Sequence, residues 1–322
     1  MPGSSTFNGG FVNGVTIRGL PIAQTHPGKV FWVNNSSALA EGGVGGSDGN
    51  DGSMKRPFRT IDYAIGRCAA NRGDIILVMP GHAETLSAAG AITADVAGVA
   101  IIGLGTGSLR PTLTLDTATT ATIAVSAANV TFKNIVFTAN FADIVSVFTL
   151  TTAKHFTLEN CYIKATATNM NFLYVVDTNA TTADADGMAL LGNKWIEPDT
   201  ATESFVKMDG TNADVRYEDN FIQIGVGNNK SAVFAVATGK IVTNLQLLRN
   251  RTIRLNTDTA TGALLFHTDG STNSGIVADN YSQHADTAAE LIVTASSGLS
   301  LFQNYSSGVN GNSGYVIATI DT

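Results

Sequence analysis

The chain has 322 residues, 44% of them hydrophobic and 14% charged, and a formal net charge of −7. That length allows a large buried core, and the acidic balance lacks the basic surface typical of nucleic-acid-binding proteins, so no nucleic-acid partner is expected. The 33 glycines against 7 prolines favour many short strands joined by tight turns.

Residues 1–56 differ from the rest and are predicted to form an N-terminal docking arm followed by a Gly-rich linker over 42–53. Too little of this segment is apolar to form its own core, so we expect it to become ordered against a partner. Its candidate docking residues are Phe11, Val15, Ile17, Arg18, Leu20 and Ile22. The first residues lack the basic and apolar regions of a secretion signal, and no apolar run reaches the roughly 18 residues of a membrane span, so no membrane partner is expected.

An amphipathic helix is predicted at the start of the second region, residues 57–322. Thr60 can cap its first turn and Gly73 can end it. Its apolar side chains recur at helical spacing, at Ile61, Ala64, Ile65, Cys68 and Ala69. A strand over 74–79 follows directly.

Downstream, short alternating strands recur, each ending just before an asparagine. These asparagines are Asn134, Asn160, Asn193, Asn220, Asn250, Asn280 and Asn304. Successive positions differ by 24 to 33 residues, which suits one coil of a solenoid. A second strand lies between successive asparagines, and no helix separates the strands. The pattern predicts an all-β fold, a parallel β-helix of about eight rungs.

Two interpretations of the asparagine column stay open. In a stacked fold, each side-chain amide can hydrogen-bond to the amides of the coils above and below, forming a ladder. Alternatively, Asn is there only because it is common in turns. The terminal coil of such a stack would expose its core and its strand edge, so the predicted helix is expected to act as a cap.

Two resemblances follow from the N-terminal motifs. Gly46–Gly52, Pro57–Phe58, Thr60–Ile61, Gly73–Ile76 and Pro80–Glu84 together resemble the N-terminal cap and first rung of the pectate-lyase-like right-handed parallel β-helix superfamily, over about forty residues. Separately, Phe11–Gly19 resembles the start of tailed-phage virion proteins, including capsid decoration proteins and fibres. The first resemblance implies the fold, and the second implies a particle component.

The superfamily includes polysaccharide lyases and hydrolases, whose sites need two or three acidic residues at matched heights. The best acidic cluster here is Asp177, Asp184 and Asp186, although this segment also has the composition of a solvated turn. No catalytic residue, metal ligand or cofactor is assigned, and Cys68 and Cys161 are expected to be reduced, packed thiols.

We therefore expect a structural protein and not an enzyme: a phage capsid decoration, cement or spike subunit. It would be made in the host cytoplasm, be located in the virion, form a homotrimer and bind capsid or tail proteins through its arm. The alternative is a tailspike-type polysaccharide depolymerase, either a lyase or a glycoside hydrolase, of the same fold.

Overall fold

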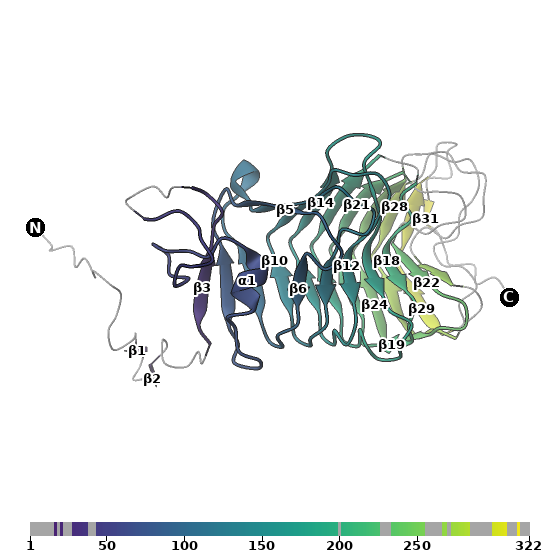
Figure 1. Ribbon diagram of the computed structural model, residues 1–322. Coiled ribbons are helices and arrows are strands. Elements are labelled where there is room, and N and C mark those ends of the chain that lie inside the picture. The colour runs from purple at the N-terminus through teal and green to yellow at the C-terminus, as the bar shows by residue number, and fades with distance from the viewer. Residues whose placement is uncertain are drawn as a thin grey trace, which may run out of the picture.

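The computed structural model describes residues 28–37, 43–198, 201–225, 233–253, 272–283 and 298–305 with their side chains. It describes the backbone alone at 16–17, 20–21, 254, 266–268, 306–307 and 314–315. Within these residues the chain winds as an all-β solenoid of stacked parallel strands, so the predicted fold class is confirmed (Figure 1). No helix in the described ranges is long and apolar enough to cross a membrane.

Three sheets run along the shaft, and consecutive strands of the chain pass from one sheet to the next. The first sheet contains β3 (Val30–Val33), β4 (Ile75–Val78), β7 (Ala100–Gly103), β10 (Thr131–Lys133), β13 (Thr157–Glu159), β16 (Ala189–Leu191), β20 (Arg216–Glu218), β24 (Leu245–Leu248), β27 (Gly275–Ala278) and β29 (Leu299–Phe302). The second contains β5 (Ala83–Leu86), β8 (Thr112–Leu115), β11 (Val136–Ala139), β14 (Tyr162–Ala165), β17 (Lys194–Glu197), β21 (Phe221–Ile224), β25 (Arg251–Arg254), β28 (Tyr281–Gln283), β30 (Tyr305–Ser307) and β31 (Gly314–Tyr315). The third contains β6 (Ile92–Ala94), β9 (Ile123–Val125), β12 (Ile144–Leu150), β15 (Phe172–Thr178), β18 (Ser204–Met208), β22 (Phe234–Val236) and β26 (Phe266–Thr268).

Four short strands lie outside these sheets. They are β1 (Thr16–Ile17) with β2 (Leu20–Pro21), which pair antiparallel, and β19 (Asn212–Ala213) with β23 (Val242–Thr243), which pair parallel. Within the main sheets all pairs are parallel except β30 with β31. The predicted number of about eight coils differs slightly from the structure, in which the third sheet has seven strands and each of the other two has ten.

The core is built from inward side chains that lie one above another in successive coils. In the first sheet, for example, Phe132 pairs in register with Leu158, which pairs in turn with Leu190. All three are fully buried. Because a strand alternates sides with a period of two, every in-register strand adds the same inward positions to one continuous core.

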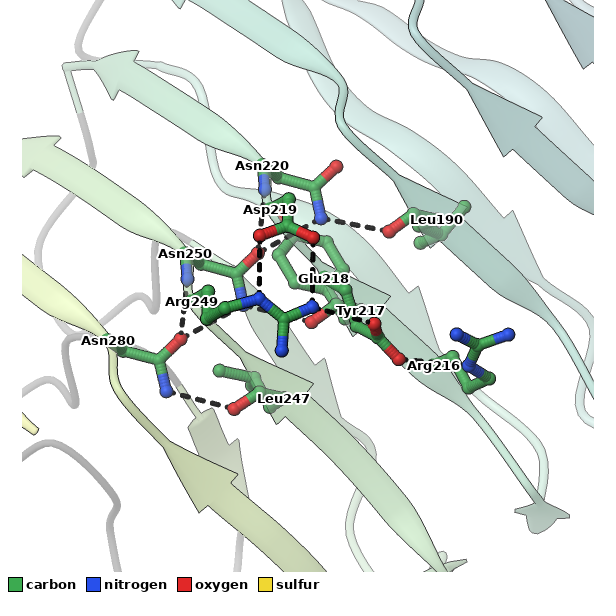
Figure 2. Close-up of polar contacts among 10 residues, drawn as sticks. All are labelled: Leu190, Arg216, Tyr217, Glu218, Asp219, Asn220, Leu247, Arg249, Asn250 and Asn280. Carbon is green, nitrogen blue, oxygen red and sulfur yellow. Dashed lines mark hydrogen bonds and ion pairs between the residues drawn. The ribbon is translucent and has the colours of Figure 1, made fainter. Parts of the chain in front are cut away.

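The corner between the first and second sheets carries a ladder of buried amides (Figure 2). In each of these coils a residue with positive φ is followed by an inward asparagine; the ladder consists of Asn193, Asn220, Asn250, Asn280 and Asn304. The Oδ1 atom of each later member accepts from both the backbone N–H and the side-chain amide of the member before it, at 2.9–3.2 Å. Each side-chain amide also donates to a backbone carbonyl of the preceding coil.

The two upstream asparagines lie one residue out of this phase. Asn134 and Asn160 occupy the positive-φ position itself, at φ 56° and 50°. The inward place is taken by Ile135 and Cys161, and the N–H of Cys161 donates to Asn193 Oδ1 at 2.9 Å. Asparagine tolerates left-handed backbone angles and also stacks as an amide, so the sequence alone does not distinguish the two positions.

Helix α1 (Ile61–Ile65) covers the N-terminal edge of the third sheet, as expected of a cap, but it is shorter than predicted. Thr60 caps it by accepting from the Tyr63 N–H, and the Asp62 carboxylate accepts from the N–H of Thr93 in β6. The helix ends at Gly66, and Gly73 lies beyond it with a positive φ.

A buried carboxylate, Asp74, holds the segment that follows the helix. Asp74 accepts from the Ala69 N–H at 2.7 Å, from the Lys29 N–H at 2.7 Å and from the Arg72 guanidinium at 2.6 and 2.7 Å. The Ala69 N–H thus donates to the Asp74 carboxylate and not to a helical carbonyl. The carboxylate therefore joins the helix, the first sheet and the segment that enters β3.

The end of the first sheet is covered by residues that the sequence placed in the arm and linker. Strand β3 pairs with β4, and residues 43–58 bond to β3 through Trp32 N–H to Gly52 O and Phe58 N–H to Trp32 O. In the described part of this region, residues 28–37 and 43–56 lie on the solenoid. Position 52 requires glycine, since its φ is 76° and a Cβ there would lie 2.4 Å from the Phe58 ring.

We predict that replacing Asp74 with Asn removes an acid-sensitive part of the stability. Although burial opposes the charge, the Arg72 guanidinium and the two backbone N–H groups lower the pKa of Asp74 to about 2. A lowered pKa stabilises the fold at pH values above the ordinary carboxyl pKa, and this contribution disappears as the pH falls from about 4 to 2. Thermal unfolding should show D74N about 2–3 kcal/mol less stable at pH 7, with the difference shrinking below pH 4. An equal difference at pH 7 and pH 2 contradicts the assignment.

Candidate functional site

A group of acid and base side chains lies on the outward face of the third sheet, on β15 and β18. Register pairs Asp177 with Lys207, and Lys207 with Ala235 one coil further on. On the opposite side, Asp177 pairs with Thr149. A charged pair is thus flanked along the shaft by two short side chains.

Lys207 is the centre of this cluster. Its Nζ atom lies 2.7 Å from Asp209 Oδ2 and 3.5 Å from Asp177 Oδ1, and 5.5 Å from the centre of the Tyr174 ring. The Tyr174 hydroxyl donates to Glu203. We call Tyr174, Asp177, Glu203, Lys207 and Asp209 the Lys207 cluster. Two carboxylates therefore share one ammonium group, with a phenol and a third carboxylate beside them.

The surroundings of this cluster hold its groups in defined protonation states. Burial, together with the Asp209 charge, raises the pKa of Asp177 despite the opposing charge of Lys207. Burial and the Glu203 hydrogen bond raise the pKa of Tyr174. Burial opposes the charge on Lys207, but the Asp209 hydrogen bond and both carboxylates raise its pKa. At neutral pH the phenol and the ammonium therefore keep their protons, and Asp177 accepts a proton more readily than an ordinary aspartate.

These states favour some reactions over others. A protonated ammonium and a protonated phenol are poor bases, so neither suits the abstraction of a proton from carbon. A carboxyl group with a raised pKa beside a second carboxylate suits acid-assisted cleavage of a glycosidic bond.

The three predicted acidic residues do not form one cluster. Asp177 belongs to the Lys207 cluster, whereas Asp184 accepts from the Asn179 side chain at 2.8 Å. Asp186 accepts from the Ala213 N–H at 2.8 Å and lies 3.8 Å from Lys154 Nζ. The last two thus stabilise the turn between β15 and β16. Among the described residues, no three His, Cys, Asp or Glu side chains converge to hold a metal ion.

The other predicted residues lie away from this cluster. Phe11, Val15, Arg18 and Ile22 fall outside the described residues, and only the backbone of Ile17 and Leu20 is described, where the two pair between β1 and β2. Cys68 and Cys161 are free thiols, and burial raises the pKa of each to about 12.

Sequence reasoning missed four members of the cluster, namely Tyr174, Glu203, Lys207 and Asp209. A partial signal is present, because Phe172–Val176 and Phe205–Met208 are apolar segments typical of strands in successive coils. The observed register between these strands places Asp177 beside Lys207. The members of the cluster are far apart in the chain because neighbours in a solenoid come from successive coils.

Comparison with known proteins gives little beyond the fold. No family model matches the chain, and no curated protein matches it. A solved structure described as a rhamnogalacturonan lyase matches with a TM-score of 0.44 and 12% identity, over 86% of this chain and 87% of that one. These comparisons do not support the prediction that the chain is not an enzyme, and it is not retained.

Proposed function

We propose that the protein is a polysaccharide-cleaving enzyme, a glycoside hydrolase whose active surface is the Lys207 cluster. The observation that carries the proposal is the pair of carboxylates, Asp177 and Asp209, on the single ammonium of Lys207. Lys207 and Asp209 are about one-third exposed and Asp177 is 17% exposed, so the cluster is accessible yet partly shielded from water.

The roles follow from the environments. Asp177, with its raised pKa, donates a proton to the oxygen of the leaving sugar. Asp209 bonds to the anomeric carbon as the glycosidic bond breaks, and water then releases the sugar after giving a proton to Asp177. Lys207 orients both carboxylates, and the Tyr174 hydroxyl, held by Glu203, is a positioning group at the edge of the site.

The test is the release of reducing ends from a panel of glycans that includes polygalacturonate, alginate, dextran and bacterial capsular polysaccharide. Asp177→Asn and Asp209→Asn should each lower the rate about a hundredfold or more. The matched control is Lys133→Met, because Lys133 forms a similar cross-strand ion pair with Glu159 on the first sheet, at 2.7 Å. The control should retain full activity.

Because Asp177 must be protonated, the wild-type rate should fall as the pH rises through its raised pKa. Two results contradict the proposal: no product from any glycan, or unchanged rates in both Asn variants. The N-terminal resemblance to virion proteins adds a separate proposal, that residues 1–27 attach the protein to a phage particle. Deleting residues 1–27 tests this, and particles that retain the truncated protein contradict it.

A further inference from the structure

A second surface with unusual chemistry runs along the outward face of the second sheet. Register pairs place aromatic and cationic side chains alternately in one column: Tyr162, Lys194, Phe221, Arg251 and Tyr281. We call this column the aromatic–cation stripe. Each member comes from a different coil, so the stripe runs parallel to the solenoid axis, with steps of about 4.8 Å.

The rings hold the two cations in place. Lys194 Nζ lies 5.2 Å from the centre of the Tyr162 ring and 5.8 Å from that of Phe221. The Arg251 guanidinium lies 5.7 Å from the Phe221 ring and 5.6 Å from that of Tyr281. Each cation is therefore fixed between two rings before any ligand arrives, which reduces the ordering cost of binding.

The stripe has cations without compensating acids, in a chain whose net charge is −7. Lys194 and Arg251 are both exposed, and neither forms an ion pair with a carboxylate among the described residues. On β14, β17, β21, β25 and β28 the one carboxylate is Glu197, which points inward and is fully buried. At the adjoining corner, Asp219 is paired with Arg249, and Asp279 is exposed.

We propose that the aromatic–cation stripe binds a linear acidic polysaccharide that lies along the solenoid axis. The repeated cations, two coils or about 9.6 Å apart, complement carboxylates that recur along such a chain. The aromatic rings add apolar contact for the sugar rings between those carboxylates. This surface lies on a different sheet from the Lys207 cluster, so the proposal does not depend on catalysis.

The experiment is affinity electrophoresis of the full chain in gels that contain polygalacturonate. The double variant Lys194→Gln/Arg251→Gln should bind about tenfold more weakly than the wild type. Lys133→Gln/Arg216→Gln, on the first sheet, removes the same two charges and should bind as the wild type does. Lys194 and Arg251 are both exposed, and thermal melting checks that each double variant remains folded.

Charge is tested separately by replacing polygalacturonate with its methyl-esterified form, which should not retard the wild-type protein. Phe221→Ala keeps both cations but removes the ring between them, so it should show an intermediate loss. Three results overturn the proposal. Wild type and the Lys194→Gln/Arg251→Gln variant could be retarded equally by polygalacturonate, or the wild type could be retarded equally by polygalacturonate and by its esterified form. The wild type could also bind oligothymidylate more tightly than polygalacturonate. Asp177→Asn should still be retarded, which separates a failure here from a failure of the hydrolase proposal.

Discussion

Replacing Asn220 with Ala should lower the free energy of unfolding by about 3–5 kcal/mol. The substitution removes the acceptor of the Asn193 backbone N–H, at 2.9 Å, and the donor to Leu190 O, also at 2.9 Å. Asn193 is 1% exposed, so its N–H cannot turn to water. Each buried polar group left without a partner costs about 1–3 kcal/mol. Chemical denaturation of wild type and variant measures the difference.

The matched control is Asn160→Ala, which changes the same residue type at the corresponding corner. Asn160 is exposed and lies at φ 50°, outside the ladder. Its loss should cost only about 1–2 kcal/mol of left-handed backbone strain, and Asn160→Gly should restore the wild-type value. Equal losses of stability in N160A and N220A would show that the side-chain hydrogen bonds of the ladder add nothing to the free energy of unfolding.

Trp195→Ala should be the most damaging single change in the core, at about 5 kcal/mol. Trp195 is fully buried and packs edge-on against Phe205, with ring centres 5.7 Å apart. Its indole N–H also donates to Glu197 at 2.6 Å, and this buried carboxylate accepts from the Phe172 N–H as well. The substitution thus opens a cavity and removes one donor from a buried charge.

Trp195→Phe separates these two contributions. It keeps a ring in the core but removes the indole N–H, so it should cost about 1–3 kcal/mol, well below the alanine variant. Thermal and chemical unfolding of the three proteins give the comparison. Equal losses in both variants would mean that the hydrogen bond to Glu197, and not the packing, dominates.

The fold could be predicted because its defining feature is local and repeated. Each coil contains short alternating strands and a sharp corner, and parallel stacking is the arrangement that joins such strands without helices. The extent of α1 could not be predicted in the same way. The apolar spacing continues to Cys68 and Ala69, but the helix ends at Ile65, and the N–H groups of Arg67 and Cys68 already donate to carbonyls three residues back.

The candidate site was only partly predictable, for a related reason. Asp177 was selected because it lies near other acids in the chain, whereas its observed partner, Lys207, lies one coil away. The asparagines at the corner between the first and second sheets were only partly predictable for the same reason. Asn160 and Asn193 both follow a strand, yet only the register between coils places one at the exposed bend and the other inside.

Product analysis in isotopically labelled water tests the central claim most directly. If the Lys207 cluster hydrolyses a glycosidic bond, each new reducing end formed in ¹⁸O-water will carry one heavy oxygen, and Asp177→Asn will abolish its formation. Products that instead bear unsaturated ends without the label would show elimination, and labelled products from the Asp177→Asn variant at the wild-type rate would place the chemistry elsewhere.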